Sequence, residues 1–182
     1  MFAPTKTLPD PVSGRVMGVD PGLTRCGYAV MVAGSSGSAQ ALAMGVLRTD
    51  KDDRTPSRLA ILQADIEALL EEFRPAVVAV ERVFFRSNVR TAIGVAQASG
   101  VVLAAAARRG CAVAEYTPSQ VKDTVAGWGA ADKAGVQRMV QMRLGLAGLP
   151  KPADAADAAA IALCHLAMSP GLVAAAASKA RQ

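Results

Sequence analysis

A short apolar run ends in an acid at Val16-Met17-Gly18-Val19-Asp20-Pro21-Gly22. A strand over residues 15–19 can be fully extended and buried, and Pro21-Gly22 stops it with a fixed φ followed by a permissive one. A second apolar run at 26–32 follows a short turn, so the stretch predicts a hairpin that carries Asp20 at the mouth of a sheet. Considered by itself, Asp20 could equally stabilise the turn, because an Asp side chain in a turn hydrogen-bonds to the nearby backbone.

The size and composition of the chain predict one domain. Its 182 residues, 52% of them hydrophobic, suffice for a single well-formed core. We expect residues 1–14, which contain Pro4, Pro9 and Pro11, to form a disordered lead-in, residues 15–168 to form the domain, and residues 169–182 to form a flexible tail. No uninterrupted apolar run reaches the ~20 residues that a membrane-spanning helix needs, so no membrane association is expected.

Charge and cysteine content narrow the class of partner and the compartment. The formal net charge is +5, which suits a polyanionic partner. Cys26, Cys111 and Cys164 are odd in number and form no C-x-x-C pair, so neither a disulfide framework nor a zinc site is predicted. We therefore expect a cytoplasmic protein.

The rest of the chain alternates between strand and helix patterns. After the hairpin, these patterns predict strands at 40–48, 76–80 and 111–115 and helices at 54–73, 88–108, 119–125, 132–144 and 153–168. Strand 76–80 is continuously apolar, as in a central parallel strand, and Glu81 ends it as Asp20 ends the first strand. If these two strands pair in parallel, both acids lie at the edge of the sheet where ligands of open α/β sheets collect.

Two further acids, Asp154 and Asp157, open the last predicted helix and lie on one face of it. One explanation is that they stabilise the helix N-terminus, a common role worth about 0.3 to 1 kcal/mol each. Four acids at three element ends are better explained by bound cations, because clustered carboxylates repel one another. Oxygen ligands without Cys or His select Mg²⁺ or Mn²⁺, and two such ions about 4 Å apart catalyse phosphodiester hydrolysis. His165 lies about 16 Å along the helix from Asp154 and is excluded from such a site.

These acids and their surroundings resemble the RuvC family of Holliday-junction resolvases, which has the ribonuclease H-like (retroviral-integrase) fold. The resemblance covers about residues 16–165 and is carried by G-V-D-P-G-L-T-R-C-G-Y at 18–28, E-R-V-F at 81–84 and D-A-A-D-A at 154–158. It implies an α/β domain with a five-stranded mixed sheet flanked by helices. It also implies a Mg²⁺-dependent endonuclease that resolves four-way DNA junctions in recombination and repair by paired symmetric nicks, with two Mg²⁺ per active site and Mn²⁺ as a substitute.

The resemblance also assigns roles to individual residues. The catalytic metal ligands correspond to Asp20, Glu81, Asp154 and Asp157. DNA contacts are expected from Phe84, Arg86, Asn88, Arg90, Lys122 and Lys133. Phe84 corresponds to an aromatic beside the junction, although it could instead fill the core, and the basic side chains could be ordinary solvated charges. Residues 129–132 (Gly-Ala-Ala-Asp) and Gly135 depart from the family's pattern, which leaves the DNA contacts of this loop open.

Two other functions fit parts of the sequence. An actin-like ATPase also has D-x-G followed by Thr and Gly in its first phosphate loop, but it needs a second lobe for which this chain is too short. A non-catalytic DNA-binding module of the same fold would not need all four acids. Because a junction must be cut on two strands, we expect a homodimer that pairs through helix 88–108, which is apolar nearly all round; burial of that helix within a monomer is the alternative. The resemblance further implies a complex with the RuvA-RuvB branch-migration machinery.

Overall fold

The computed structural model describes residues 11–34, 38–83 and 89–169, and only the backbone of residues 89–91. Along the chain its elements are β1 (Val12–Asp20), β2 (Arg25–Ala33), β3 (Ala39–Arg48), α1 (Thr55–Phe73), β4 (Pro75–Glu81), α2 (Val89–Arg108), β5 (Ala112–Tyr116), α3 (Pro118–Ala126), α4 (Lys133–Leu144) and α5 (Ala153–Met168). Within these described residues, no helix is long and apolar enough to cross a membrane.

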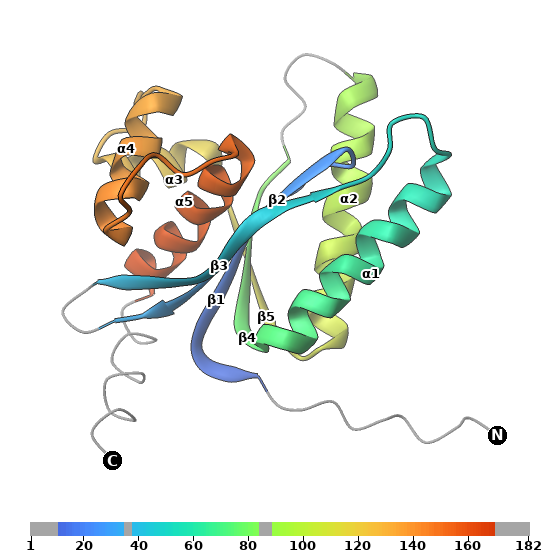
Figure 1. Ribbon diagram of the computed structural model, residues 1–182, viewed down its shortest axis with the longest axis horizontal. Coiled ribbons are helices and arrows are strands. Elements are labelled where there is room, and N and C mark those ends of the chain that lie inside the picture. The colour runs from blue at the N-terminus through green and yellow to red at the C-terminus, as the bar shows by residue number, and fades with distance from the viewer. Residues whose placement is uncertain (1–10, 35–37, 84–88, 170–182) are drawn as a thin grey trace.

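The strands form one mixed sheet in the order β3-β2-β1-β4-β5. The pairs β1–β2 and β2–β3 are antiparallel, whereas β1–β4 and β4–β5 are parallel. Figure 1 shows α1 and α2 on one side of the sheet and α3, α4 and α5 on the other. The predicted five-stranded mixed sheet flanked by helices is therefore confirmed.

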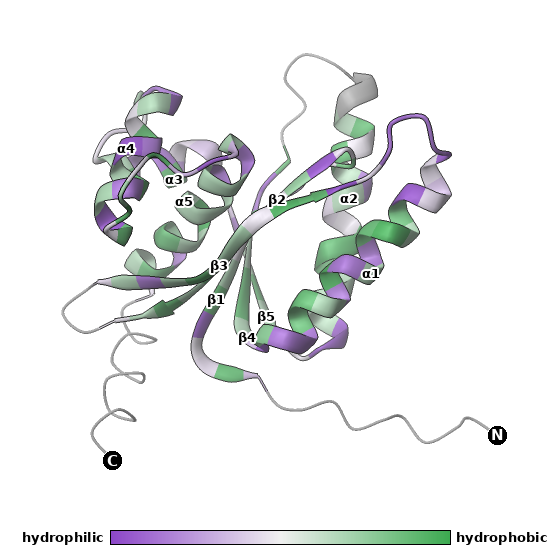
Figure 2. Ribbon diagram, in the orientation of Figure 1, coloured by the Kyte–Doolittle hydropathy of each residue, from purple (hydrophilic) through white to green (hydrophobic). Residues whose placement is uncertain are grey.

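Two apolar clusters, one on each face of the sheet, hold the layers together. In the central strand β1, Val16 joins the cluster of α5 and its neighbour Met17 joins that of α1 and α2, as the alternation of a strand requires. The α1 side uses large side chains, including Leu62, Ile66 and Leu70. In Figure 2 the central strands are mostly in hydrophobic colours, and α1 alternates between hydrophobic and hydrophilic ones as an amphipathic helix does.

α5 packs on the opposite face with small side chains. Its buried alanines are Ala155, Ala156, Ala158, Ala159, Ala160 and Ala162. Valines of α3 and α4, such as Val125 and Val140, belong to the same cluster, and both helices lie beside α5 in Figure 1. α5 is therefore enclosed between the sheet and a further helical layer.

The N-terminal boundary of the domain differs from the prediction. Residues 12–14, expected in a disordered lead-in, belong to β1, where the Val12 N–H donates to the Arg74 carbonyl at 2.7 Å. Gly14 has φ 81°, a glycine conformation, within the stretch where the register against β4 shifts. Gly14 interrupts the apolar pattern, which hid the start of the strand. Residues 1–10 and 170–182 lie outside the described residues, so the rest of the lead-in and of the tail stays a prediction.

α2 has one buried face and one exposed stripe. Ala98, Val102 and Ala106 are fully buried against the sheet and α1. The exposed stripe repeats every three or four residues and consists of Ile93, Gln97, Gly100 and Ala104. Ile93 is 51% exposed. The surface that α2 offers to a partner is therefore narrower than its apolar sequence suggested.

Candidate active site

β1 and β4 end at the same edge of the sheet, and each ends in an acid. Their parallel register pairs Val19 with Val80, so Asp20 and Glu81 follow at neighbouring positions. The alternation of side chains turns both acids to the face that α5 covers, and both are partly buried. The parallel pairing predicted from the sequence is confirmed, and it brings these two carboxylates together.

α5 begins over this edge because two glycines allow it to approach the sheet. A Cβ at Gly18 would lie 2.7 Å from the backbone nitrogen of Ala162, and a Cβ at Gly27 would lie 2.7 Å from the carbonyl carbon of Asp154. Both distances are too short for a carbon atom, so a larger residue would push the helix away. Gly27 pairs directly with Asp20 across the hairpin, which sets the first turn of α5 beside that acid. Sequence reasoning overlooked these glycines, although both stand in the motif at 18–28.

The four acids form one electrostatic cluster. Burial, followed by the charges of Glu81, Asp157 and Asp154, raises the pKa of Asp20 from 3.8 to about 7. The pKa of Glu81 is also raised, first by burial and then by Asp157. Carboxylates titrate at higher pH in this way when like charges lie close and water is scarce. The structure thus places Glu81, Asp154 and Asp157 within electrostatic reach of Asp20.

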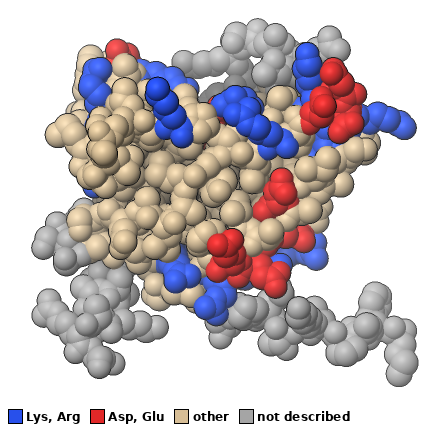
Figure 3. Space-filling model, viewed as in Figure 1, with Lys and Arg blue, Asp and Glu red and all other residues tan. Residues whose placement is uncertain are grey.

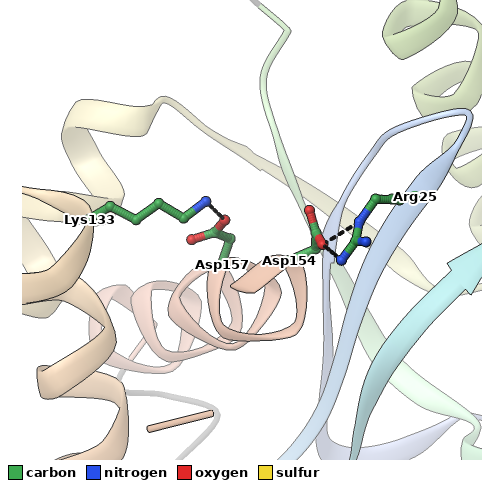
Figure 4. Close-up of polar contacts among 4 residues, drawn as sticks. All are labelled: Arg25, Lys133, Asp154 and Asp157. Carbon is green, nitrogen blue, oxygen red and sulfur yellow. Dashed lines mark hydrogen bonds and ion pairs between the residues drawn. The ribbon is translucent and has the colours of Figure 1, made fainter. Parts of the chain in front are cut away.

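Basic side chains hold the two acids of α5 from opposite directions (Figure 4). Lys133 Nζ donates to Asp157 Oδ2 at 2.6 Å. Arg25 donates to Asp154 Oδ2 through Nε at 2.8 Å and also through Nη2. The hydrogen bond to Asp157 is the main cause of a raised pKa of Lys133. Lys133 was predicted to act here, whereas Arg25 was not, because nothing in the turn sequence shows that it reaches α5.

A cavity of about 250 Å³ lies beside the acids. Asp20, Glu81 and Asp157 line it together with Lys122 and Lys133. Asp154 does not line it and instead faces Arg25. In the described part of the chain, no three Asp, Glu, His or Cys side chains form a ready-made metal-binding group. The donor chemistry nevertheless fits a hard divalent cation, since such a cation favours carboxylate oxygens and relieves their repulsion.

The predicted DNA contacts are described only in part. Lys122 from α3 and Lys133 from α4 border the acid cavity. Arg90 is described in its backbone alone, and the residues outside the described ranges are Phe84, Arg86 and Asn88. The sequence predictions for these four side chains therefore stay predictions.

The contacts of His165 and Gly135 are with residues of the fold outside the acid cluster. His165 is buried, and its Nδ1 lies 2.7 Å from the Tyr116 hydroxyl. It does not line the acid cavity. The Gly135 N–H donates to Asp132 Oδ1 at 2.6 Å, where a Cβ would lie 2.9 Å from that oxygen. Glycine therefore suits the cap that starts α4 and sets the position of Lys133.

Comparisons with known proteins agree with this fold. The family model described as crossover junction endodeoxyribonuclease RuvC matches residues 16–165. The crossover junction endodeoxyribonuclease RuvC of Rhodococcus jostii is 54% identical over 151 residues, which cover 83% of this chain and 80% of that protein.

Two solved structures extend the likeness to three dimensions. The Thermus thermophilus RuvC structure has a TM-score of 0.81 and 38% identity, and the match covers 86% of this chain and 96% of that one. T. thermophilus RuvC in complex with Holliday junction substrate has a TM-score of 0.82 and 38% identity, with coverages of 87% and 96%. The ribonuclease H-like fold predicted from the sequence is thus the one observed. Because the family model matches residues 16–165, which are most of this chain, the chain belongs to the RuvC family of crossover junction endodeoxyribonucleases.

Proposed function

We propose that this protein resolves four-way DNA junctions in recombination and repair by paired symmetric nicks. Membership of a family of metal-dependent nucleases supports the hydrolytic activity, and a relative bound to a Holliday junction supports the substrate. The observation that carries the proposal is the acid cluster at one sheet edge, whose members jointly raise the pKa of Asp20. Such a cluster is costly for stability, which argues that it serves catalysis.

The proposed metal ligands are Asp20, Glu81, Asp154 and Asp157, and the proposed metals are two Mg²⁺ ions, with Mn²⁺ as a substitute. When bound, such a pair supplies a water nucleophile and stabilises the leaving oxygen. Asp20 and Glu81 are presented by the ends of paired strands, and Asp20 must release its proton to act as a ligand. Asp154 and Asp157 already hold Arg25 and Lys133, so metal binding competes with these two ion pairs.

Basic and aromatic residues around the cluster are the proposed DNA contacts. Lys122 and Lys133 border the acid cavity from the α3 and α4 side, where they suit phosphate oxygens. The segment after Glu81 supplies the other proposed contacts, which are Phe84, Arg86, Asn88 and Arg90. Phe84 is proposed to stack on a base unpaired at the crossover, an interaction worth about 1 to 3 kcal/mol.

The proposed active unit is a homodimer. Each chain has one acid cluster, whereas a junction is nearly two-fold symmetric and must be cut on two strands. The exposed stripe of α2 is not covered by any described element and includes the half-exposed Ile93. A two-fold contact along this stripe would hold two clusters at a fixed separation.

In the cell, we place the dimer in the cytoplasm with the RuvA-RuvB branch-migration machinery as its partner. The family resemblance supports this partner. The three cysteines are free and buried, in keeping with a reducing compartment.

Cleavage of a synthetic four-way junction tests the proposed function. Each strand of the junction is labelled in turn and incubated with the protein and Mg²⁺, and a linear duplex of the same sequence serves as the control. We expect nicks at symmetric positions on two opposing strands, with ends that a ligase rejoins, and an intact duplex. Equal cutting of the duplex, or no cutting of the junction, would contradict the proposal.

A further inference from the structure

A second cavity, of about 750 Å³, is lined by Arg25, whose side chain also bonds Asp154 of the acid cluster. It is formed by the β1–β2 turn, the start of α1 and the N-terminal half of α2. We call it the arginine cleft after its polar lining residues Thr24, Arg25, Thr55 and Arg58; Ile93 and Gln97 of the α2 stripe also border it, so the cleft opens beside the proposed dimer contact. None of the residues that line it is acidic, so the cleft is suited to an anion.

Arg58 faces this cleft with a fixed and partly buried guanidinium. Its Nε donates to Thr49 Oγ1 at 2.9 Å, and its Nη2 donates to Thr24 Oγ1 at 2.6 Å. These bonds use only part of the five N–H donors of an arginine and hold its plane in place. Among the ion pairs of the described residues, none includes Arg58. A preorganised guanidinium without a matching carboxylate suits bidentate binding of a phosphate.

Arg25 connects the arginine cleft to the acid cluster. It lines the cleft while its Nε and Nη2 both bind Asp154 Oδ2. Lys133 approaches the acids of α5 from the opposite direction, so basic groups stand on both sides of the cluster (Figure 4). Figure 3 shows Lys and Arg side chains along the upper margin of the molecule, together with a group of Asp and Glu side chains at its upper right.

The spacing of phosphates in DNA lets one strand contact the basic groups on both sides of the acid cluster. Successive phosphates of one strand advance about 3.4 Å along a duplex, so a strand with its reacting phosphate at the acids carries further phosphates past Arg25. Such a strand would pass from the acid cavity, by way of Arg25, to the arginine cleft.

We propose that the arginine cleft binds a backbone phosphate of the DNA strand that continues past the acid cluster. Arg58 and Arg25 bind the phosphate oxygens, and the hydroxyl groups of Thr24 and Thr55 donate further hydrogen bonds. This inference rests on the proposed function, because it needs a DNA strand at the acids. It assigns the strand a direction, away from Lys122 and Lys133 and toward the start of α1.

The salt dependence of junction binding tests the cleft. Binding of a fluorescent four-way junction is measured by anisotropy in EDTA, which prevents cutting, between about 50 and 200 mM salt. Arg58→Gln should lower the magnitude of the slope of log K against log salt by about 0.9, which makes the loss of affinity over this range about 3.5-fold smaller. Arg54→Gln is the matched control, since Arg54 is the exposed N-cap of α1 and does not line the cleft. Its effect should be less than half as large.

Arg58→Lys separates phosphate binding from the structural bonds of Arg58. It keeps the charge but not the fork that bonds Thr24 and Thr49, so the slope should stay close to that of the unaltered protein even if the melting temperature falls. If Arg58→Lys loses as much slope as Arg58→Gln, or if Arg54→Gln matches Arg58→Gln, the cleft is not a phosphate site. Lys122→Ala and Lys133→Ala would keep their own slope losses in that case, leaving the proposed function intact. No junction binding by the unaltered protein would instead remove both.

A small phosphate ligand is the other possible source of the same chemistry. Calorimetric titration with inorganic phosphate and with ATP distinguishes it from DNA. Binding that Arg58→Gln abolishes, together with an unchanged junction slope, would overturn the assignment to DNA. We expect a reduced slope and no saturable binding of either small ligand at millimolar concentration.

Discussion

The two faces of the sheet are packed in different ways, and the difference separates stability from positioning. On the α1 and α2 face, Leu62, Ile66 and Leu70 fill the space with large side chains. On the α5 face, alanines of the helix lie against Gly18 and Gly27 of the sheet. Large side chains bury more apolar area, at roughly 25 cal/mol per Å². Small ones let two backbones approach, which sets Asp154 and Asp157 beside Asp20.

The outer sides of the two helical layers differ as well. α3 and α4 cover α5, whereas the stripe of α2 is exposed and borders a groove beside Leu59 and Gln63 of α1. The acids are therefore positioned by this chain alone, and the α2 side of the molecule is open to a partner. Four changes test whether the two sides have these separate roles.

Removal of an acid on the α5 face should have the largest effect. Asp20→Asn or Asp157→Asn keeps the side-chain shape but removes a charged oxygen, and it should lower junction cleavage by at least about 10² to 10³-fold. Junction binding should stay within about tenfold, or ~1.4 kcal/mol, because Lys and Arg supply most of the affinity.

Leu62→Ala on the other face is the control for this loss of cleavage. It should cost about 2 to 5 kcal/mol of stability while the folded protein cuts at the normal rate. Full activity of Asp20→Asn would refute the assignment of the acids.

A charge in the exposed stripe of α2 should weaken the dimer. Ala104→Glu places two like charges close together across a two-fold contact, and we expect dissociation to become at least about 100-fold easier, or ~2.7 kcal/mol. Sedimentation at micromolar concentration measures this change. Met142→Glu on α4, at a side chain that is 71% exposed on the other side of the sheet, should leave the dimer intact. A monomer that still makes paired nicks before any substitution would contradict the dimer.

A methyl group between β1 and α5 should reduce stability. In Gly18→Ala the new Cβ meets the backbone of α5, which cannot move aside as a side chain can, so we expect a loss of about 1 to 3 kcal/mol in urea unfolding. Gly148→Ala, between α4 and α5, is the matched change, since no atom lies within 4 Å of its new Cβ and its φ is not positive. That variant should change stability by less than about 0.5 kcal/mol. Equal effects of the two changes would show that the α5 face is not closely packed.

The fold was predictable where a local pattern decides it. The apolar run before Glu81 and the helical spacing of Leu62, Ile66 and Leu70 each report a buried element, and turn residues mark their ends. The acids could be found because three element ends carried them. The start of β1 at Val12 could not, because Gly14 breaks the apolar pattern just where the strand pairs with β4.

Contacts between segments that are far apart in the sequence could not be predicted from such local patterns. Arg25 and Asp154 are 129 positions apart, and their ion pair exists only because α5 docks beside the hairpin. The close approach of α5 to the sheet depends on the absence of a side chain at Gly18 and Gly27. The backbone preferences of glycine do not show that another segment packs against these positions. Arg58 carries no signal of its own in the sequence, and only its bonds to Thr24 and Thr49 show that it lines the arginine cleft in a fixed position.

The smallest expected effect concerns pH, and it also separates the two faces. The pKa of Asp20 is about 7 in the folded protein and 3.8 as an ordinary carboxyl group, so between these values the folded state binds the extra proton. The stability that this proton gives is fully present below the lower pKa, falls as pH rises toward 7 and is gone above it. When pH rises from 6 to 8 in EDTA, the loss of the Asp20 proton should therefore lower the free energy of unfolding by about 1 kcal/mol.

Urea unfolding of the unaltered protein, Asp20→Asn and Leu62→Ala at these two pH values measures the effect. The unaltered protein and Leu62→Ala should lose the same free energy of unfolding between pH 6 and pH 8, because the α1 face adds no titrating group of its own at Leu62. Asp20→Asn should lose about 1 kcal/mol less, because the amide neither binds nor releases the proton. The same loss in all three proteins would mean that Asp20 titrates as an ordinary exposed acid. In that case the α5 face would not hold its acids in a cluster strained by burial and like charge.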